Sequence, residues 1–169
     1  MTEHAFWITS RAAGIIALLA ASLAVAVGLS RRGRDWRVVH ESLSLATMVA
    51  LAVHAFSLLG DSYINFSLAD VTIPFVSSYQ RLWMSVGIVA GWAIVILGLS
   101  YYFRGRIGVQ RWRKLHRFTA LAWVLGVGHA LMMGTDAGTP WFLLTAALVV
   151  IPAGALLVRR LTPTTPVHA

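Results

Sequence analysis

The sequence contains no cysteine and very little charge. Of its 169 residues, 58% are hydrophobic and only 12% are charged, whereas soluble domains are about a quarter charged. Without cysteine, the chain forms neither disulfides nor thiolate metal sites. Several apolar runs are long enough to cross a bilayer, which takes about 20 residues; they cover 5–29, 37–60, 82–103, 113–134 and 139–159. We therefore predict an all-α integral membrane protein, a bundle of about five transmembrane helices.

Acidic residues are scarce, six against 14 basic ones. The excess positive charge does not suit a nucleic-acid partner, because apart from Arg11 and Arg81 it is confined to three segments next to the apolar runs. These segments are 31–37, 104–117 and 159–160. The positive-inside rule assigns them to the cytoplasm. We therefore expect the lipid bilayer as the surroundings, with the N-terminus outside and the C-terminal end in the cytoplasm.

Two of the apolar runs share a repeated pattern. Each begins with Trp-Arg-x-x-His and carries a His-Ala further on, and together they contribute His40, His54, His116 and His129. Ionisable residues inside spanning helices are uncommon and usually mark function. Both runs follow a cytoplasmic segment and therefore point the same way across the membrane. We expect His40 to face His116 on the cytoplasmic side. On the outer side, His54 is expected to face His129.

The spacing within each run sets the depth and the direction of its histidines. The first two are 14 residues apart and the second two 13, which correspond to rises of about 21 Å and about 19.5 Å. Fourteen steps keep both histidines on one helix face, but 13 steps leave His129 about 140° from His116. Glycine tolerates a local change in winding. We therefore expect either a distortion at Gly126 and Gly128 or a cofactor that approaches this helix at two different angles.

Pairs of neutral imidazoles on facing helices suit low-spin haem. Zinc or copper fits less well, since each pair offers only two nitrogens and cysteine is absent. A proton relay needs polar groups between the pairs, where apolar residues such as Met48 and Trp123 lie. We predict two b-type haems, stacked between the second and fourth predicted helices. The alternative is a non-redox protein, either a histidine-lined metal or proton transporter or a membrane scaffold.

Further candidates surround these sites. Arginine pairs with carboxylates through two hydrogen bonds, so basic residues near either haem are candidates to bind its propionates. Trp123 lies midway along its helix and is a candidate to shorten the electron-tunnelling distance, with plain packing as the alternative. For the arginines the alternatives are membrane topology and contact with the lipid surface. The candidate arginines are Arg11 and Arg81 outside, and Arg37, Arg113 and Arg117 inside.

The spacings His40-x13-His54 and His116-x12-His129, with Leu-His-Arg at 115–117, resemble the ferric reductase-like transmembrane domain family. This family includes NADPH oxidases, eukaryotic ferric reductases and the bacterial haem subunit of the periplasmic methionine sulfoxide reductase system. The resemblance covers nearly the whole chain. It implies a transmembrane haem domain over residues 1–161 and a small stand-alone member in the bacterial cytoplasmic membrane. From its own composition, we expect the tail at 162–169 to be disordered. Electrons would pass from the cytoplasmic haem to the outer one.

The chain departs from that family in two respects. Members commonly have six spanning helices, with the ligands on the third and fifth, whereas here the ligands lie on the second and fourth of five. The oxidases and eukaryotic reductases continue into a flavin and nicotinamide domain, but these 169 residues contain no glycine-rich nucleotide motif. We therefore expect a haem-containing membrane subunit of an oxidoreductase. Its donor would be a cytoplasmic flavoprotein reductase or a membrane quinol, and its extracytoplasmic acceptor ferric iron, oxygen or a partner reductase.

Overall fold

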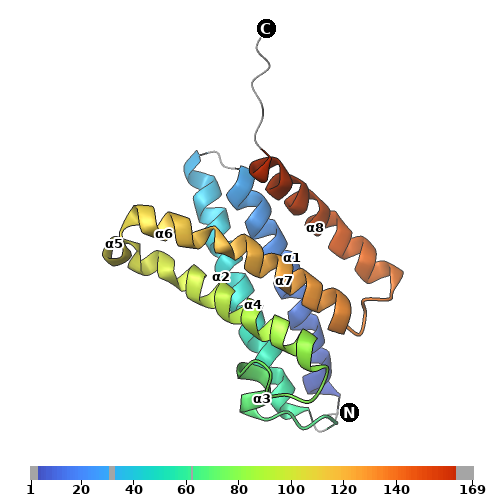
Figure 1. The fold of residues 1–169 in the computed structure, drawn as a ribbon. Coiled ribbons are helices and arrows are strands. Elements are labelled where there is room, and N and C mark those ends of the chain that lie inside the picture. Colours follow the sequence, from blue (N-terminus) through green and yellow to red (C-terminus); the bar gives the residue numbers. More distant parts are fainter. Residues whose placement is uncertain (1–3, 31–32, 62, 163–169) are drawn as a thin grey trace.

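A computed structural model describes residues 4–30, 33–61 and 63–162, and within these residues the chain is helical without β-strands. The all-α prediction is thus confirmed. Apart from Thr162, the tail predicted at 162–169 lies outside the described residues. The helices are α1 (Ala5–Ser30), α2 (Gly33–Ser57), η1 (Leu58–Gly60), α3 (Leu68–Thr72), α4 (Arg81–Leu99), η2 (Ser100–Phe103), α5 (Arg104–Ile107), α6 (Val109–His116), α7 (Phe118–Met133) and α8 (Pro140–Leu161) (Figure 1).

The helices form two antiparallel pairs. Helix α1 packs along α2, α4 packs along α7, and α8 lies against α1 (Figure 1). The buried positions of α1 are mostly small side chains, which allow neighbouring backbones to approach closely. They are Ser10, Ala13, Ala17, Leu18, Ala20, Ser22 and Ala24.

Four helical stretches are long and apolar enough to cross a membrane: Ala5–Ser30, Asp35–Gly60, Arg81–Ile107 and Pro140–Leu161. Their outward faces are apolar as well. On α8, for example, Leu144, Leu148 and Ile151 are 68%, 76% and 66% exposed. Such surfaces suit contact with lipid rather than with water. The chain is accordingly a multi-pass membrane protein.

The span predicted at 113–134 is not one helix. It is interrupted at Arg117, where α6 ends and α7 begins, and α7 has only 16 residues. The Thr119 hydroxyl donates to the His116 carbonyl at 2.6 Å, and the Ala120 N–H donates to the Arg117 carbonyl at 3.2 Å. These bonds tighten the turn and compete with the regular helix pattern. The four candidate spans therefore differ from the five that we predicted.

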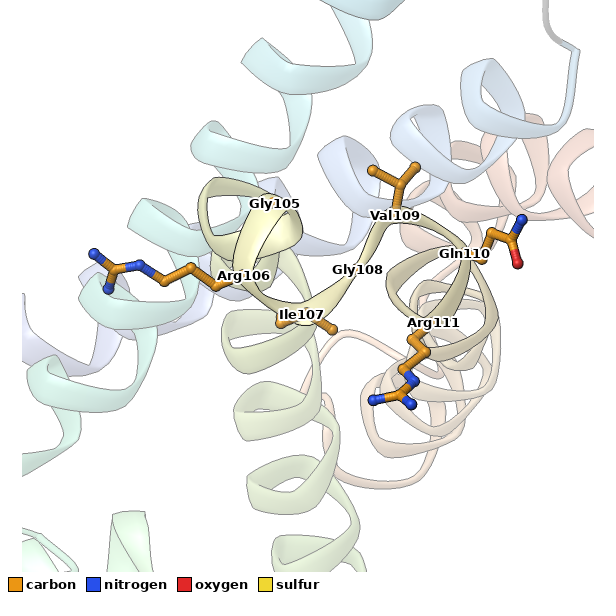
Figure 2. Close-up of a pocket in the computed structure, with 7 residues that line it drawn as sticks. All are labelled: Gly105, Arg106, Ile107, Gly108, Val109, Gln110 and Arg111. Atoms are coloured by element: carbon orange, nitrogen blue, oxygen red, sulfur yellow. The ribbon is translucent and has the colours of Figure 1, made fainter.

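The reversal between α5 and α6 depends on Gly108. Its φ of +91° lies in a region that side chains disfavour. A hollow of about 450 Å³ lies on this corner, lined by the consecutive residues 105–111 (Figure 2). The side chains of Arg106 and Arg111 point away from each other there (Figure 2). Because one turn of chain forms the whole hollow, it has no opposing wall and we do not regard it as a ligand site.

Candidate functional site

The four histidines lie in two facing pairs, matched as the sequence repeat predicted. The ring centres of His40 on α2 and His116 on α6 are 6.0 Å apart, with an interplanar angle of 61°. Those of His54 on α2 and His129 on α7 are 6.3 Å apart, at 79°. Helix α2 therefore supplies one histidine to each pair, and α2 and α6–α7 run in the same direction.

After the predicted topology, we call His54 and His129 the outer pair and His40 and His116 the inner pair. Backbone carbonyls orient the outer pair. His54 Nδ1 lies 2.8 Å from the Ser10 carbonyl oxygen, and His129 Nδ1 lies 2.9 Å from that of Trp83. Since a carbonyl only accepts hydrogen bonds, each Nδ1 must carry the proton. Each Nε2 then keeps its lone pair. Metal-binding imidazoles usually have this arrangement, with the second ring N–H donated to a carbonyl or a carboxylate.

The side chain of Ser10 also contacts His54, and the sequence analysis did not identify Ser10 as a site residue. Its hydroxyl donates to the His54 carbonyl at 2.9 Å and lies 3.1 Å from Nδ1. The side chain is 3% exposed. Ser10 therefore fixes both the ring and the backbone of His54. Nothing in the sequence singles out Ser10, which lies between the polar residues Thr9 and Arg11.

The inner pair, His40 and His116, is less completely bonded. His116 Nδ1 is buried and has no hydrogen-bond partner among the described residues. The Leu97 carbonyl is its neighbour, but the geometry falls short of a hydrogen bond. The His116 ring stacks on Trp112 with centres 4.9 Å apart, and the Trp112 indole N–H donates to Ser100 Oγ at 3.1 Å. The inner rings are thus held mainly by packing.

A cavity of about 460 Å³ lies between the two helix pairs and reaches both outer histidines. Its volume falls within the range of about 300 to 1,000 Å³ that is usual for cofactor sites. Gly91 on α4 and Gly126 on α7 line it, and nothing lies within 4 Å of where a Cβ would stand at either residue. Two lining positions therefore leave open space beside His54 and His129, as a bulky flat ligand requires.

The donor set agrees with haem better than with a metal ion held by protein alone. Two imidazoles on opposite sides of one metal, with bonds of about 2.0 to 2.1 Å, have ring centres about 6.4 Å apart, close to the 6.0 and 6.3 Å found here. In the described part of the chain, no group of three or more His, Cys, Asp or Glu residues gathers to complete a zinc site. The residues present fit a cofactor that needs two axial nitrogens.

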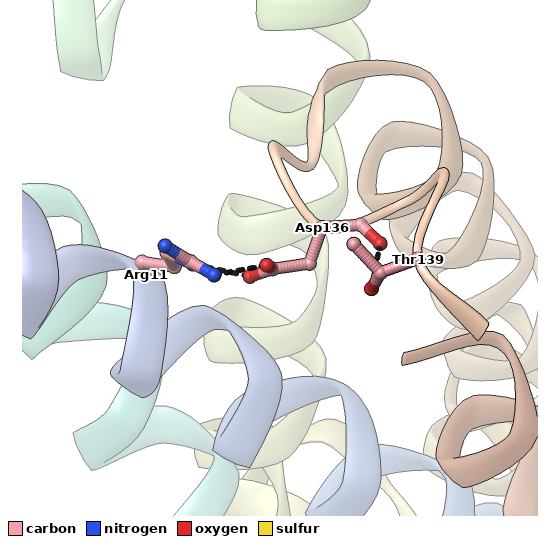
Figure 3. A network of polar contacts seen from close by, with 3 residues as sticks. All are labelled: Arg11, Asp136 and Thr139. Atoms are coloured by element: carbon pink, nitrogen blue, oxygen red, sulfur yellow. Dashed lines mark hydrogen bonds and ion pairs between the residues drawn. The ribbon is translucent and has the colours of Figure 1, made fainter. Parts of the chain in front are cut away.

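Arg11 binds Asp136, a partner that the sequence did not indicate. Its Nε and Nη2 donate to the two carboxylate oxygens, and the Thr139 hydroxyl donates to the Asp136 carbonyl at 2.7 Å (Figure 3). The Arg11 guanidinium also lies 4.9 Å from the centre of the Trp7 ring. Arg11 and Asp136 both line the cavity. The ion pair therefore joins α1 to the α7–α8 connection at the outer end of the site.

The other four basic candidates are exposed. Arg81 donates to the Phe75 carbonyl at 3.0 Å. The remaining three are exposed, and none has an ion-pair partner within the residues that the structure covers: Arg37, Arg113 and Arg117.

Trp123 is 5% exposed, and its indole N–H donates to Ser22 Oγ at 3.0 Å. It lines the cavity and at the same time anchors α7 to α1. Trp123 therefore both packs between helices and lines the cavity.

Comparison with known proteins adds no relative: no protein-family model, curated protein or solved structure matches the chain.

Proposed function

We propose that this chain conducts electrons across a membrane through two b-type haems, the inner one bound by His40 and His116 and the outer one by His54 and His129. The observation that carries this proposal is the presence of two facing histidine pairs at separations of 6.0 and 6.3 Å. Haem iron, when bound, supplies one-electron oxidation and reduction at potentials set by its ligands and surroundings.

The protein contributes orientation and the exclusion of water. The carbonyls of Ser10 and Trp83 hold the outer imidazoles in one tautomer, and a hydrogen bond of this kind also increases ligand basicity. The cavity wall is mainly apolar and includes Trp123. A histidine-lined proton path would need polar groups along that wall, whereas electron transfer does not. The lining therefore favours the redox function over a transporter.

The direction of transfer follows from the predicted topology and from the resemblance to the ferric reductase-like family. A flavoprotein reductase or a membrane quinol on the cytoplasmic side would be oxidised, and ferric iron, oxygen or a partner reductase outside would be reduced. A two-electron donor would release its electrons singly, for instance to two ferric ions. The protein would act in this way as the haem subunit of an oxidoreductase in the bacterial cytoplasmic membrane.

A reduced-minus-oxidised absorption spectrum of the purified protein tests this function. We expect a b-type haem signal, and we expect His40→Ala and His54→Ala each to remove one haem and leave the other. His4→Ala serves as the control, because His4 is exposed in the terminal turn. Absence of any haem after expression with ample haem supply would contradict the proposal and leave a non-redox membrane protein.

A further inference from the structure

Three of the four histidine rings rest on a glycine of the neighbouring helix. A Cβ at Gly14 would lie 2.9 Å from His54 Nδ1, and a Cβ at Gly28 would lie 3.0 Å from His40 Cδ2. A Cβ at Gly87 would come closer still to the His129 ring. Real Cβ atoms essentially never approach within 3.0 Å, so alanine at Gly14 or Gly87 requires the ring to move.

At the outer pair, each glycine stands four residues after the carbonyl that orients the ring. Ser10 precedes Gly14 by four, and Trp83 precedes Gly87 by four. In an α-helix the Cβ tilts toward the N-terminus, so a side chain covers the turn before its own residue. A side chain four residues after a carbonyl thus shields that oxygen. Glycine leaves it open to a donor from another helix.

We propose that Gly14 and Gly87 are positioning residues for the outer histidine pair: each lets an imidazole lie against its helix, donate from Nδ1 to the carbonyl four residues earlier, and keep Nε2 free for the cofactor. The part of this inference that concerns cofactor binding rests on the proposed haem function. The imidazole tautomer depends only on contacts within the protein. The inner pair differs, because His40 meets Gly28 with its Cδ2–Nε2 edge. Gly28 therefore provides space for the His40 ring but does not expose a carbonyl to its Nδ1.

The test compares Gly14→Ala and Gly87→Ala with Gly128→Ala. Gly128 is the matched control, since a Cβ there makes only ordinary contact, 3.9 Å from Trp83 Cζ3. Removing an orienting contact of this type usually weakens metal binding by about 10- to 100-fold. We expect Gly14→Ala and Gly87→Ala to weaken outer haem binding to that extent and to raise its high-spin fraction in electron paramagnetic resonance spectra. The inner haem and the Gly128→Ala variant should be unchanged.

A second measurement is independent of the cofactor. In the haem-free protein, ¹⁵N resonances of the imidazoles should show His54 and His129 protonated at Nδ1, and Gly87→Ala should remove this preference from His129 alone. Unchanged low-spin haem in both variants, or loss of both haems, would overturn a role specific to the outer pair. If the wild-type protein bound no haem, the proposed function would fail, and the imidazole tautomers would still decide the inference.

Discussion

Asp136 is a carboxylate with 4% of its surface exposed, in a part of the chain, between Arg117 and Arg159, that has no other charged residue. Burying an unpaired charge is costly, and the charge of Arg11 together with two hydrogen bonds offsets that cost. The Arg11 side chain is 36% exposed, so solvent screens part of the interaction. The pair therefore stabilises the contact between α1 and the α7–α8 connection mainly by keeping Asp136 satisfied.

Replacing Arg11 by leucine should reduce the free energy of unfolding by about 1 to 3 kcal/mol, since it leaves a buried acceptor without its donor. The double variant Arg11→Leu/Asp136→Leu should recover a large part of this loss, because no unpaired charge remains. Unfolding in detergent micelles with increasing SDS measures both. Equal stability of Arg11→Leu and the wild-type protein would contradict a stabilising ion pair.

Helix α7 shows how a short interruption changes the direction of a ligand. On one continuous helix, His116 and His129 would lie about 140° apart. The break at Arg117 puts the two histidines on separate helices, α6 and α7, and both rings face α2. Helix α7 continues without interruption through Gly126 and Gly128, where we had expected either a distortion of the helix or a cofactor that approaches it at two different angles. The change in direction occurs at Arg117 instead.

Gly126→Ala is informative for this reason. Glycine in a helix interior is about 0.5 to 1 kcal/mol less favourable than alanine, and a Cβ at Gly126 meets nothing within 4 Å. The haem-free variant should therefore unfold at a higher SDS concentration than the wild-type protein. The new methyl group would project into the cavity, so outer haem occupancy should fall. A less stable haem-free variant would show that Gly126 is needed for the backbone conformation instead.

Helix α3 begins with a reciprocal capping arrangement. Asp70 Oδ2 accepts from the Ser67 N–H at 2.9 Å and from the Ser67 hydroxyl at 2.6 Å, while the Asp70 N–H donates to Ser67 Oγ. The side-chain and backbone hydrogen bonds from Ser67 lower the pKa of Asp70 below its ordinary 3.8. The stability that this gives α3 is present above pH 3.8 and is lost as the pH falls through the lower folded-state value.

The pH dependence can be measured from the Asp70 carboxyl ¹³C resonance in micelles. We expect a titration midpoint below 3.8, and a shift of the midpoint back toward 3.8 in Ser67→Ala, because the variant lacks the hydroxyl donor. A midpoint for Asp70 at or above 3.8 would exclude the capping arrangement in solution.

At the level of elements, the long apolar runs in the sequence predicted the helical fold. They did not predict the helix break at Arg117, which depends on a single hydroxyl group. Hydropathy over 113–134 does not detect the bond from Thr119 to the His116 carbonyl, so the break was not foreseen. The contacts of Gly14 with His54 and of Gly28 with His40 could have been predicted from spacing in the sequence. The two glycines are 14 residues apart, as are His40 and His54, and in an antiparallel helix pair equal spacings come into register.

Over the whole molecule, the histidine pairs could be predicted because they need only helix direction and depth. Both follow from charge and spacing in the sequence. The partner of Arg11 could not be predicted in this way, because Asp136 is 125 residues away and comes close to it only when α8 folds back against α1. The orienting carbonyls of Ser10 and Trp83 were equally invisible, since every residue has a carbonyl and only packing selects the ones that are used.

The orientation in the membrane is a property of the whole chain that the absence of cysteine makes easy to test. Ser78, between α3 and α4, and Gln110, at the start of α6, are both exposed. The positive-inside rule places Ser78 outside and Gln110 in the cytoplasm, next to the basic residues of α5 and α6. In intact spheroplasts, a membrane-impermeant maleimide should label Ser78→Cys at once, and Gln110→Cys only after permeabilisation. The wild-type chain, without a thiol, provides the blank. Immediate labelling of Gln110→Cys, with protection of Ser78→Cys, would reverse the topology and with it the proposed direction of electron flow.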